Sequence, residues 1–157
     1  MKILSAAMVA AAMLVGQSAI AQEKSADNMA IVMEKVRADK KLLVAANMEL
    51  TEQEAAAFWP VYEAYQKDLA ALNERTRKAI ESYATAYNAG AVSDATAKPL
   101  LDEVLAIEGA EVDLRKSYVP KFSKVLPAAK VARYYQIEQK IRAAIRYELA
   151  NGIPLVE

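Results

Sequence analysis

Apolar residues recur every three or four positions along most of this chain, which is the spacing of one face of an α-helix. The longest run begins at Phe58 and continues without interruption to Tyr87. Thr51, followed three residues later by Glu54, has the spacing of a capping box, in which each residue satisfies a free backbone amide of the first turn. The pattern predicts one long helix over 52–88.

Similar spacings predict three further helices. In chain order, the first of the four helices covers 27–47, with Asn47 as its C-terminal cap. The third begins after Ser93, and the fourth opens at Pro127 and ends at Gly152. No segment alternates between apolar and polar residues as a strand does. The expected fold is therefore all-α, with about four long helices packed as antiparallel hairpins. Because long hairpins have much surface for little core, we expect a dimer.

The first residues follow a different pattern. Lys2 is followed by an apolar run over 3–15 and by an Ala-Ile-Ala sequence that ends at Ala21. This order predicts a secretory signal peptide over 1–21, cleaved after Ala21, and a periplasmic location. An uncleaved anchor is the alternative, although the run is shorter than the ~20 residues that a membrane-spanning helix needs. The remaining 22–157 suit a single helical domain.

Composition bears on the chemistry, because the chain contains neither histidine nor cysteine. The usual nucleophile–base pairs and the commonest ligands for zinc are therefore missing. Met29 and Met33 could bind copper, and Glu108, Glu111 and Asp113 could bind a metal, but core filling and a solvated face are the favoured interpretations. We expect a protein that is not an enzyme and has no cofactor and no metal.

Charge is unevenly distributed, with an acidic stretch over 94–114 and a basic stretch over 115–146. The basic stretch carries the candidate client- or partner-binding residues Arg133, Tyr134, Tyr135, Lys140, Arg142 and Arg146. Pairing between hairpin arms or a solvated face would also explain this pattern. Without Lys2 the 20 basic residues fall to 19 against 20 acidic ones, and this balance argues against binding to nucleic acid.

Two pentapeptides each open a predicted helix: Leu-Thr-Glu-Gln-Glu from Leu50 and Leu-Pro-Ala-Ala-Lys from Leu126. With the signal peptide and four helices, this layout resembles the Spy/CpxP family of periplasmic proteins, whose hallmark is a repeated L-T-x-x-Q motif. The first pentapeptide matches at Leu50 and Thr51 and has Glu54 where the family has glutamine. The second matches only at Leu126.

The resemblance implies a cradle-shaped homodimer and an ATP-independent stress chaperone that binds unfolded or acidic periplasmic proteins. The alternative is a regulatory partner or inhibitor of an envelope-stress sensor or of an anti-sigma factor. Relatives that respond to zinc or nickel use histidine-rich sites, which this chain lacks. No stable membrane insertion is expected after signal cleavage. The apolar tail 153–156 is expected to dock on a helix.

Overall fold

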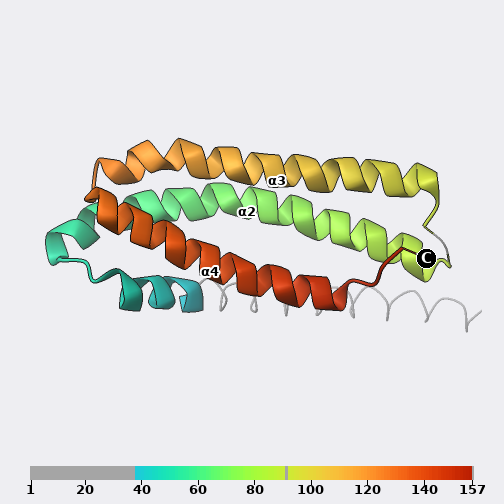
Figure 1. Ribbon diagram of the computed structural model, residues 1–157, viewed down its shortest axis with the longest axis horizontal. Coiled ribbons are helices and arrows are strands. Elements are labelled where there is room, and N and C mark those ends of the chain that lie inside the picture. The colour runs from blue at the N-terminus through green and yellow to red at the C-terminus, as the bar shows by residue number, and fades with distance from the viewer. Residues whose placement is uncertain (1–37, 91, 157) are drawn as a thin grey trace, which may run out of the picture. The chain divides into compact units, whose positions relative to one another are not determined.

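The computed structural model describes residues 38–90 and 92–156, and every regular element in these ranges is a helix (Figure 1). Residues 38–48 are helical, and the later helices are α2 (Glu52–Asn88), α3 (Asp94–Ser123) and α4 (Ala128–Gly152). The prediction of an all-helical fold with long antiparallel hairpins is confirmed. The expected signal peptide, its cleavage site and the start of the first helix lie outside the described residues.

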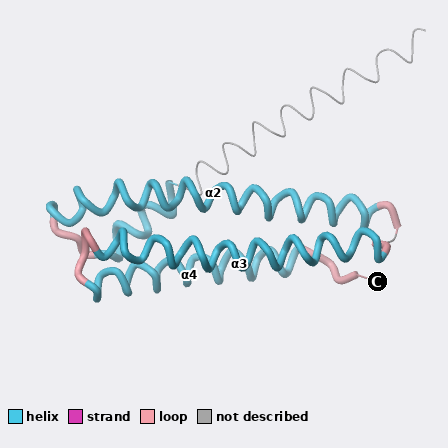
Figure 2. Tube along the Cα trace, turned by 90° about the horizontal axis from the view of Figure 1, so that it is seen from above, coloured by secondary structure: helices cyan, strands magenta, loops and turns pink. Residues whose placement is uncertain are grey.

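The chain divides into two compact units, Met1–Ala46 and Asn47–Glu157. In the first unit, the described residues 38–46 are helical. The second unit contains α2, α3 and α4. In this part of the chain α3 runs antiparallel to α2, and α4 runs antiparallel to α3 (Figures 1 and 2).

The start of α2 is fixed by the capping box. The Glu54 amide donates to Thr51 Oγ1 at 3.2 Å, and the Thr51 amide donates to Glu54 Oε2 at 2.9 Å. The preceding helix ends one residue later than predicted, at Met48, and the chain turns at Glu49, whose φ of 51° is left-handed. The prediction that Asn47 caps this helix was therefore wrong, because the backbone reverses two residues further on.

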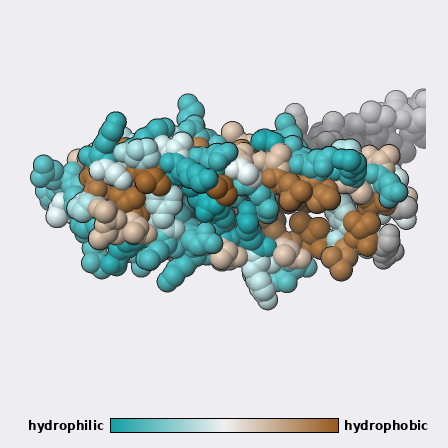
Figure 3. Space-filling view, turned by 45° about the horizontal axis from the view of Figure 1, so that its top comes forward, coloured by the Kyte–Doolittle hydropathy of each residue, from teal (hydrophilic) through white to brown (hydrophobic). Residues whose placement is uncertain are grey.

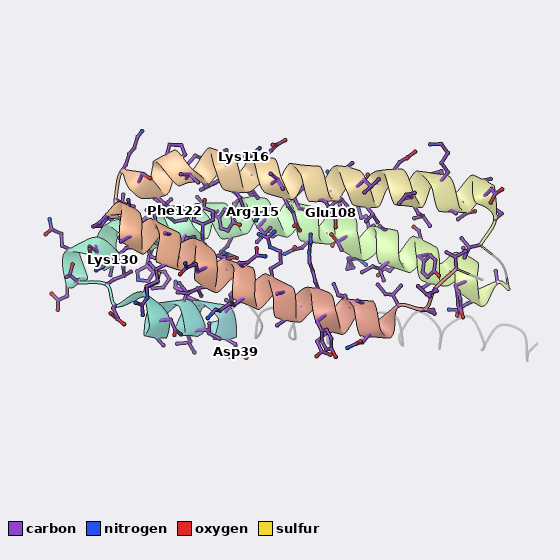
Figure 4. All side chains as sticks on the ribbon, in the orientation of Figure 1. Asp39, Glu108, Arg115, Lys116, Phe122 and Lys130 are labelled. Carbon is purple, nitrogen blue, oxygen red and sulfur yellow. The ribbon has the colours of Figure 1, made fainter. Side chains whose placement is uncertain are left out.

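Large aromatic rings join the three helices at the end of the unit where α2 begins and α3 meets α4. Phe122 of α3 lies at their centre, with its ring centroid 4.7 Å from that of Tyr134 and 5.6 Å from that of Phe58 (Figure 4). We call this group the aromatic cluster; its members are Phe58, Tyr62 and Tyr65 of α2, Tyr118 and Phe122 of α3, and Tyr134 and Tyr135 of α4. The α4 backbone lies further from α2 than the α3 backbone does. The large rings fill the space between α4 and α2.

At the opposite end of the unit, where α2 ends and α3 begins, apolar side chains are exposed to solvent. Apolar surface gathers there in Figure 3, and Leu101 is 59% exposed. The C-terminal tail reaches this end, because the Tyr83 hydroxyl donates to the Pro154 carbonyl at 2.9 Å. Leu155 nevertheless remains 87% exposed, so the tail docks through its backbone and leaves apolar side chains in water.

Candidate interaction site

The first of the predicted binding residues, Arg133, is engaged within the unit. Its Nε donates to the Asn47 carbonyl at 2.5 Å, and its Nη2 lies 2.7 Å from Glu49 Oε1. Lys130, one turn earlier, donates to Glu54 Oε2 at 2.5 Å. That hydrogen bond lowers the pKa of the Glu54 carboxyl below its ordinary value. The start of α4 is thereby attached to the turn that precedes α2.

The adjacent tyrosines have different surroundings, as expected for neighbours on one helix. Tyr134 is fully buried in the aromatic cluster, and its hydroxyl donates to Glu138 Oε1 at 3.2 Å. Gln66 of α2 donates to the same carboxylate at 3.1 Å, so the buried Glu138 receives hydrogen bonds from two helices. Burial raises the pKa of Tyr134 far above its ordinary range.

Tyr135 is half-buried between α4 and α3. Its hydroxyl donates to the Arg115 carbonyl at 2.8 Å, and burial raises its pKa to about 12. Tyr135, Gln136, Gln139 and Lys140 line a shallow, open hollow on the surface of α4. Lys140 is exposed there and forms no ion pair with another residue of the described part of the chain.

The remaining two predicted residues pair with the acidic stretch of α3. Arg142 Nη1 lies 3.3 Å from Glu111 Oε2, and this pair is largely buried, with side-chain exposures of 18% and 12%. Arg146 lies 3.0 Å from the same carboxylate and 3.7 Å from Glu108 Oε1. Much of the predicted basic surface is therefore neutralised by neighbouring helix arms, one of the two alternatives that the sequence had left open.

The six predicted residues do not form one continuous exposed surface. Arg133 and Tyr134 help to hold the start of α4, and Arg142 and Arg146 connect its middle to α3, whereas Lys140 faces solvent. Within the described ranges, no group of three histidine, cysteine or carboxylate residues converges to hold a metal ion. Also within these ranges, no helix has both the length and the apolar character needed to cross a membrane.

A different set of side chains is available for contact. All residues from 143 to 152 are exposed, including Ile145 at 46%, Tyr147 at 66% and Leu149 at 39%. The tail adds Leu155 and Val156 at 87% and 55%. We call these five residues the α4 apolar surface. The helical spacing of apolar residues from Tyr134 through Ile145 to Leu149 predicts that these two aliphatic residues belong to the packed face of the last helix, and it gives no signal for Tyr147.

Comparisons with protein-family models, with curated protein sequences and with solved structures found no match to this chain.

Proposed function

We propose that this protein is exported to the periplasm and acts there as an ATP-independent stress chaperone, with unfolded clients docking on the α4 apolar surface. The observation that carries this proposal is the exposure of five apolar side chains in the last part of α4 and in the tail that follows it. Ile145 and Leu149 are one helical turn apart and so lie on the same side of α4, and exposed apolar surface of this kind is typical of a site that binds other proteins. The resemblance to the Spy/CpxP family is consistent with the same activity.

The chemistry of this surface suits clients without a fixed structure. Apolar contact is non-directional and roughly proportional to the area removed from water, so it does not require a defined partner shape. Lys140, and the half-exposed Arg146, lie on α4 close to these apolar side chains and would attract acidic segments. Arg142 has little exposed surface for this role because it is paired with Glu111.

The test is light scattering by an unfolding client protein, with and without purified Gln22–Glu157, in the absence of ATP. We expect suppression of scattering at near-stoichiometric ratios. Combined replacement of Ile145 and Leu149 by serine should weaken this suppression, because it removes the two exposed apolar side chains that lie one turn apart on the same side of α4. Ile145→Ser alone should also weaken suppression, and Val104→Ser on α3 is its matched control, since the two residues are 46% and 44% exposed.

Unchanged suppression by the well-folded double variant would mean that the α4 apolar surface is not the client site. Lys140→Ser tests the contribution of charge without disturbing an ion pair of the described residues, whereas replacing Arg133 or Arg142 would also weaken the unit. If neither acidic nor basic clients are protected, the chaperone proposal is wrong. Recovery of one stoichiometric partner from envelope extract would then favour the regulatory alternative.

A further inference from the structure

The hollow on the surface of α4 is separate from the α4 apolar surface. It is shallow and open, with a volume of about 590 Å³, and this size lies within the range of sites that bind small molecules. Tyr135 and Gln139 are one helical turn apart, and so are Gln136 and Lys140. The four lining side chains therefore share one side of the helix, and we call this site the α4 hollow.

The ring of Tyr135 gives the α4 hollow a fixed wall. The Tyr135 hydroxyl donates to the Arg115 carbonyl at 2.8 Å, and the ring centroid lies 5.6 Å from that of Tyr134 and 6.0 Å from that of Phe122. These contacts orient the ring before any ligand arrives. Because the hydroxyl is already bonded to a carbonyl, Tyr135 offers a ligand chiefly the apolar part of its ring.

The polar groups of the α4 hollow are available to a ligand. Gln136, Gln139 and Lys140 are exposed, and none of them forms a hydrogen bond or an ion pair with another residue of 38–90 and 92–156. A glutamine amide combines an acceptor oxygen with two N–H donors, so it can both accept from and donate to a hydroxyl group. The Lys140 ammonium adds a positive charge that can bind a carboxylate.

We propose that the α4 hollow binds a saccharide whose rings carry carboxylate groups, as the uronic acids do. One sugar ring stacks its C–H face on the ring of Tyr135. Its hydroxyl groups exchange hydrogen bonds with the amides of Gln136 and Gln139, and its carboxylate accepts from Lys140. Because the hollow is shallow and open, the saccharide chain can continue past it in both directions.

An acidic peptide is the competing ligand, and the backbone of α4 argues against it. Residues 135–140 lie within α4, more than one turn from either end, so their N–H and C=O groups are bonded inside the helix. The hollow therefore offers no main-chain partner, which is a common source of affinity for an extended peptide. Side-chain amides beside an aromatic ring instead match a ligand that is rich in hydroxyl groups.

Saccharide binding is independent of the client binding proposed above, and either can fail alone. Ile145 and Leu149 do not line the α4 hollow, so their combined replacement by serine should leave saccharide binding unchanged. Gln139→Ala should in turn leave the suppression of light scattering unchanged. Lys140 takes part in both proposals, so its variants do not separate them.

The first experiment is an NMR titration of ¹⁵N-labelled Gln22–Glu157 with trigalacturonate, which has a carboxylate on each ring, and with its methyl ester, which is neutral. The side-chain amide signals of Gln136 and Gln139 should shift, whereas those of Gln53, an exposed glutamine of α2, should not. Binding of neither saccharide at millimolar concentrations would overturn the proposal. Binding of tetraglutamate as tight as that of trigalacturonate would also overturn it, in favour of an acidic protein segment.

The second experiment repeats the titration with variants that separate charge from hydrogen bonding. Lys140→Gln should weaken the binding of trigalacturonate at least about threefold and leave that of the methyl ester unchanged, because only the acid bears charge. Lys116→Gln, which removes an equally exposed lysine of α3, is the matched control and should change neither. Gln139→Ala should weaken both saccharides about fivefold, through the loss of one hydrogen bond.

The stacking contact has its own pair of variants. Tyr135→Phe keeps the ring and should retain binding, whereas Tyr135→Leu should weaken both saccharides about threefold to tenfold. Circular dichroism checks that each variant is folded. Parent-like binding by folded Tyr135→Leu and Gln139→Ala proteins would show that the α4 hollow is not the saccharide site.

Discussion

The two halves of α4 carry similar apolar spacing but have different surroundings. In the first half, Val131, Tyr134 and Ile137 are buried, and even the charged Glu138 is only 3% exposed. In the second half, residues 143–152 are all exposed although Ile145 and Leu149 continue the same stripe. The difference shows that periodicity specifies a helix and its potential face, whereas burial depends on what the neighbouring helices present to that face.

The neighbours explain the contrast. Opposite the first half lie the large rings of Phe58 and Phe122, which pack against the ring of Tyr134 of α4. Further along, α3 presents Glu111 and Glu108, which pair with arginines of α4. Burial of apolar area by the rings contributes roughly 25 cal/mol per Å², whereas the half-exposed pair of Arg146 with Glu108 contributes about 0–1 kcal/mol. We therefore expect the first half of α4 to anchor the helix to α2 and α3, and the second half to be available for contacts with other proteins.

The largest expected effect comes from removing one ring of the aromatic cluster. Phe122 is fully buried, so Phe122→Ala should lower the free energy of unfolding by about 3–5 kcal/mol, through lost burial and the cavity left behind. Ile145→Ala in the exposed half should change it by less than about 0.5 kcal/mol. Urea denaturation followed by circular dichroism measures both. Similar losses in the two variants would abolish the distinction between the halves.

The next effect concerns the buried carboxylate that joins α4 to α2. Gln66→Leu removes a hydrogen bond to Glu138 and should cost about 1–3 kcal/mol, because a charged group stays buried with fewer partners. The same denaturation experiment measures it. Gln136→Leu is the control on the solvent side of α4, where we expect stability to stay within about 0.5 kcal/mol of the parent.

A smaller loss is expected at the start of α2, which leads into the aromatic cluster. Thr51→Ala deletes the side-chain oxygen that accepts the Glu54 amide and should cost about 1 kcal/mol. Thr51→Ser keeps that oxygen and should retain most of the stability. If alanine and serine behave alike in thermal unfolding, the capping box does not stabilise this helix.

The smallest expected effect is on pH dependence. The pKa of Glu54 lies below its ordinary value of 4.5, mainly because Lys130 donates to it. A lowered folded-state pKa gives stability that is present above the ordinary pKa and is lost as pH falls through the lowered one. Lys130→Ala should raise the Glu54 pKa toward 4.5, although the Thr51 amide still lowers it. Carboxyl chemical shifts in an NMR titration measure the change, and an unaltered pKa would contradict it.

Much of the fold could be predicted because its signals are local. The capping box and the uninterrupted stripe predicted a helix over 52–88, and α2 spans Glu52–Asn88. The end of the preceding helix was misplaced because a glutamate with positive φ leaves little trace in a sequence; Glu49 adopts that conformation where its side chain pairs with Arg133. That contact is distant in sequence, so local patterns could not reveal it.

The site was harder to predict for a related reason. Two adjacent residues of a helix cannot share one face, but adjacency does not show that Tyr134 would be the buried tyrosine, because that depends on the rings of two other helices. The net charge of a stretch likewise does not identify pairs such as Arg142 with Glu111. The exposure of Ile145 follows from what lies opposite it, which periodicity alone does not specify.

The single tryptophan gives the aromatic cluster an optical reporter of its own. The indole ring of Trp59 lies 5.0 Å from the ring of Phe58 and 5.3 Å from that of Tyr62. Its emission, excited directly or by energy transfer from the neighbouring tyrosines, will follow loosening of this end of the molecule. The opposite end has tyrosines but no indole, so a client bound there should leave the tryptophan spectrum largely unchanged, while the loss of the cluster should shift it to the red.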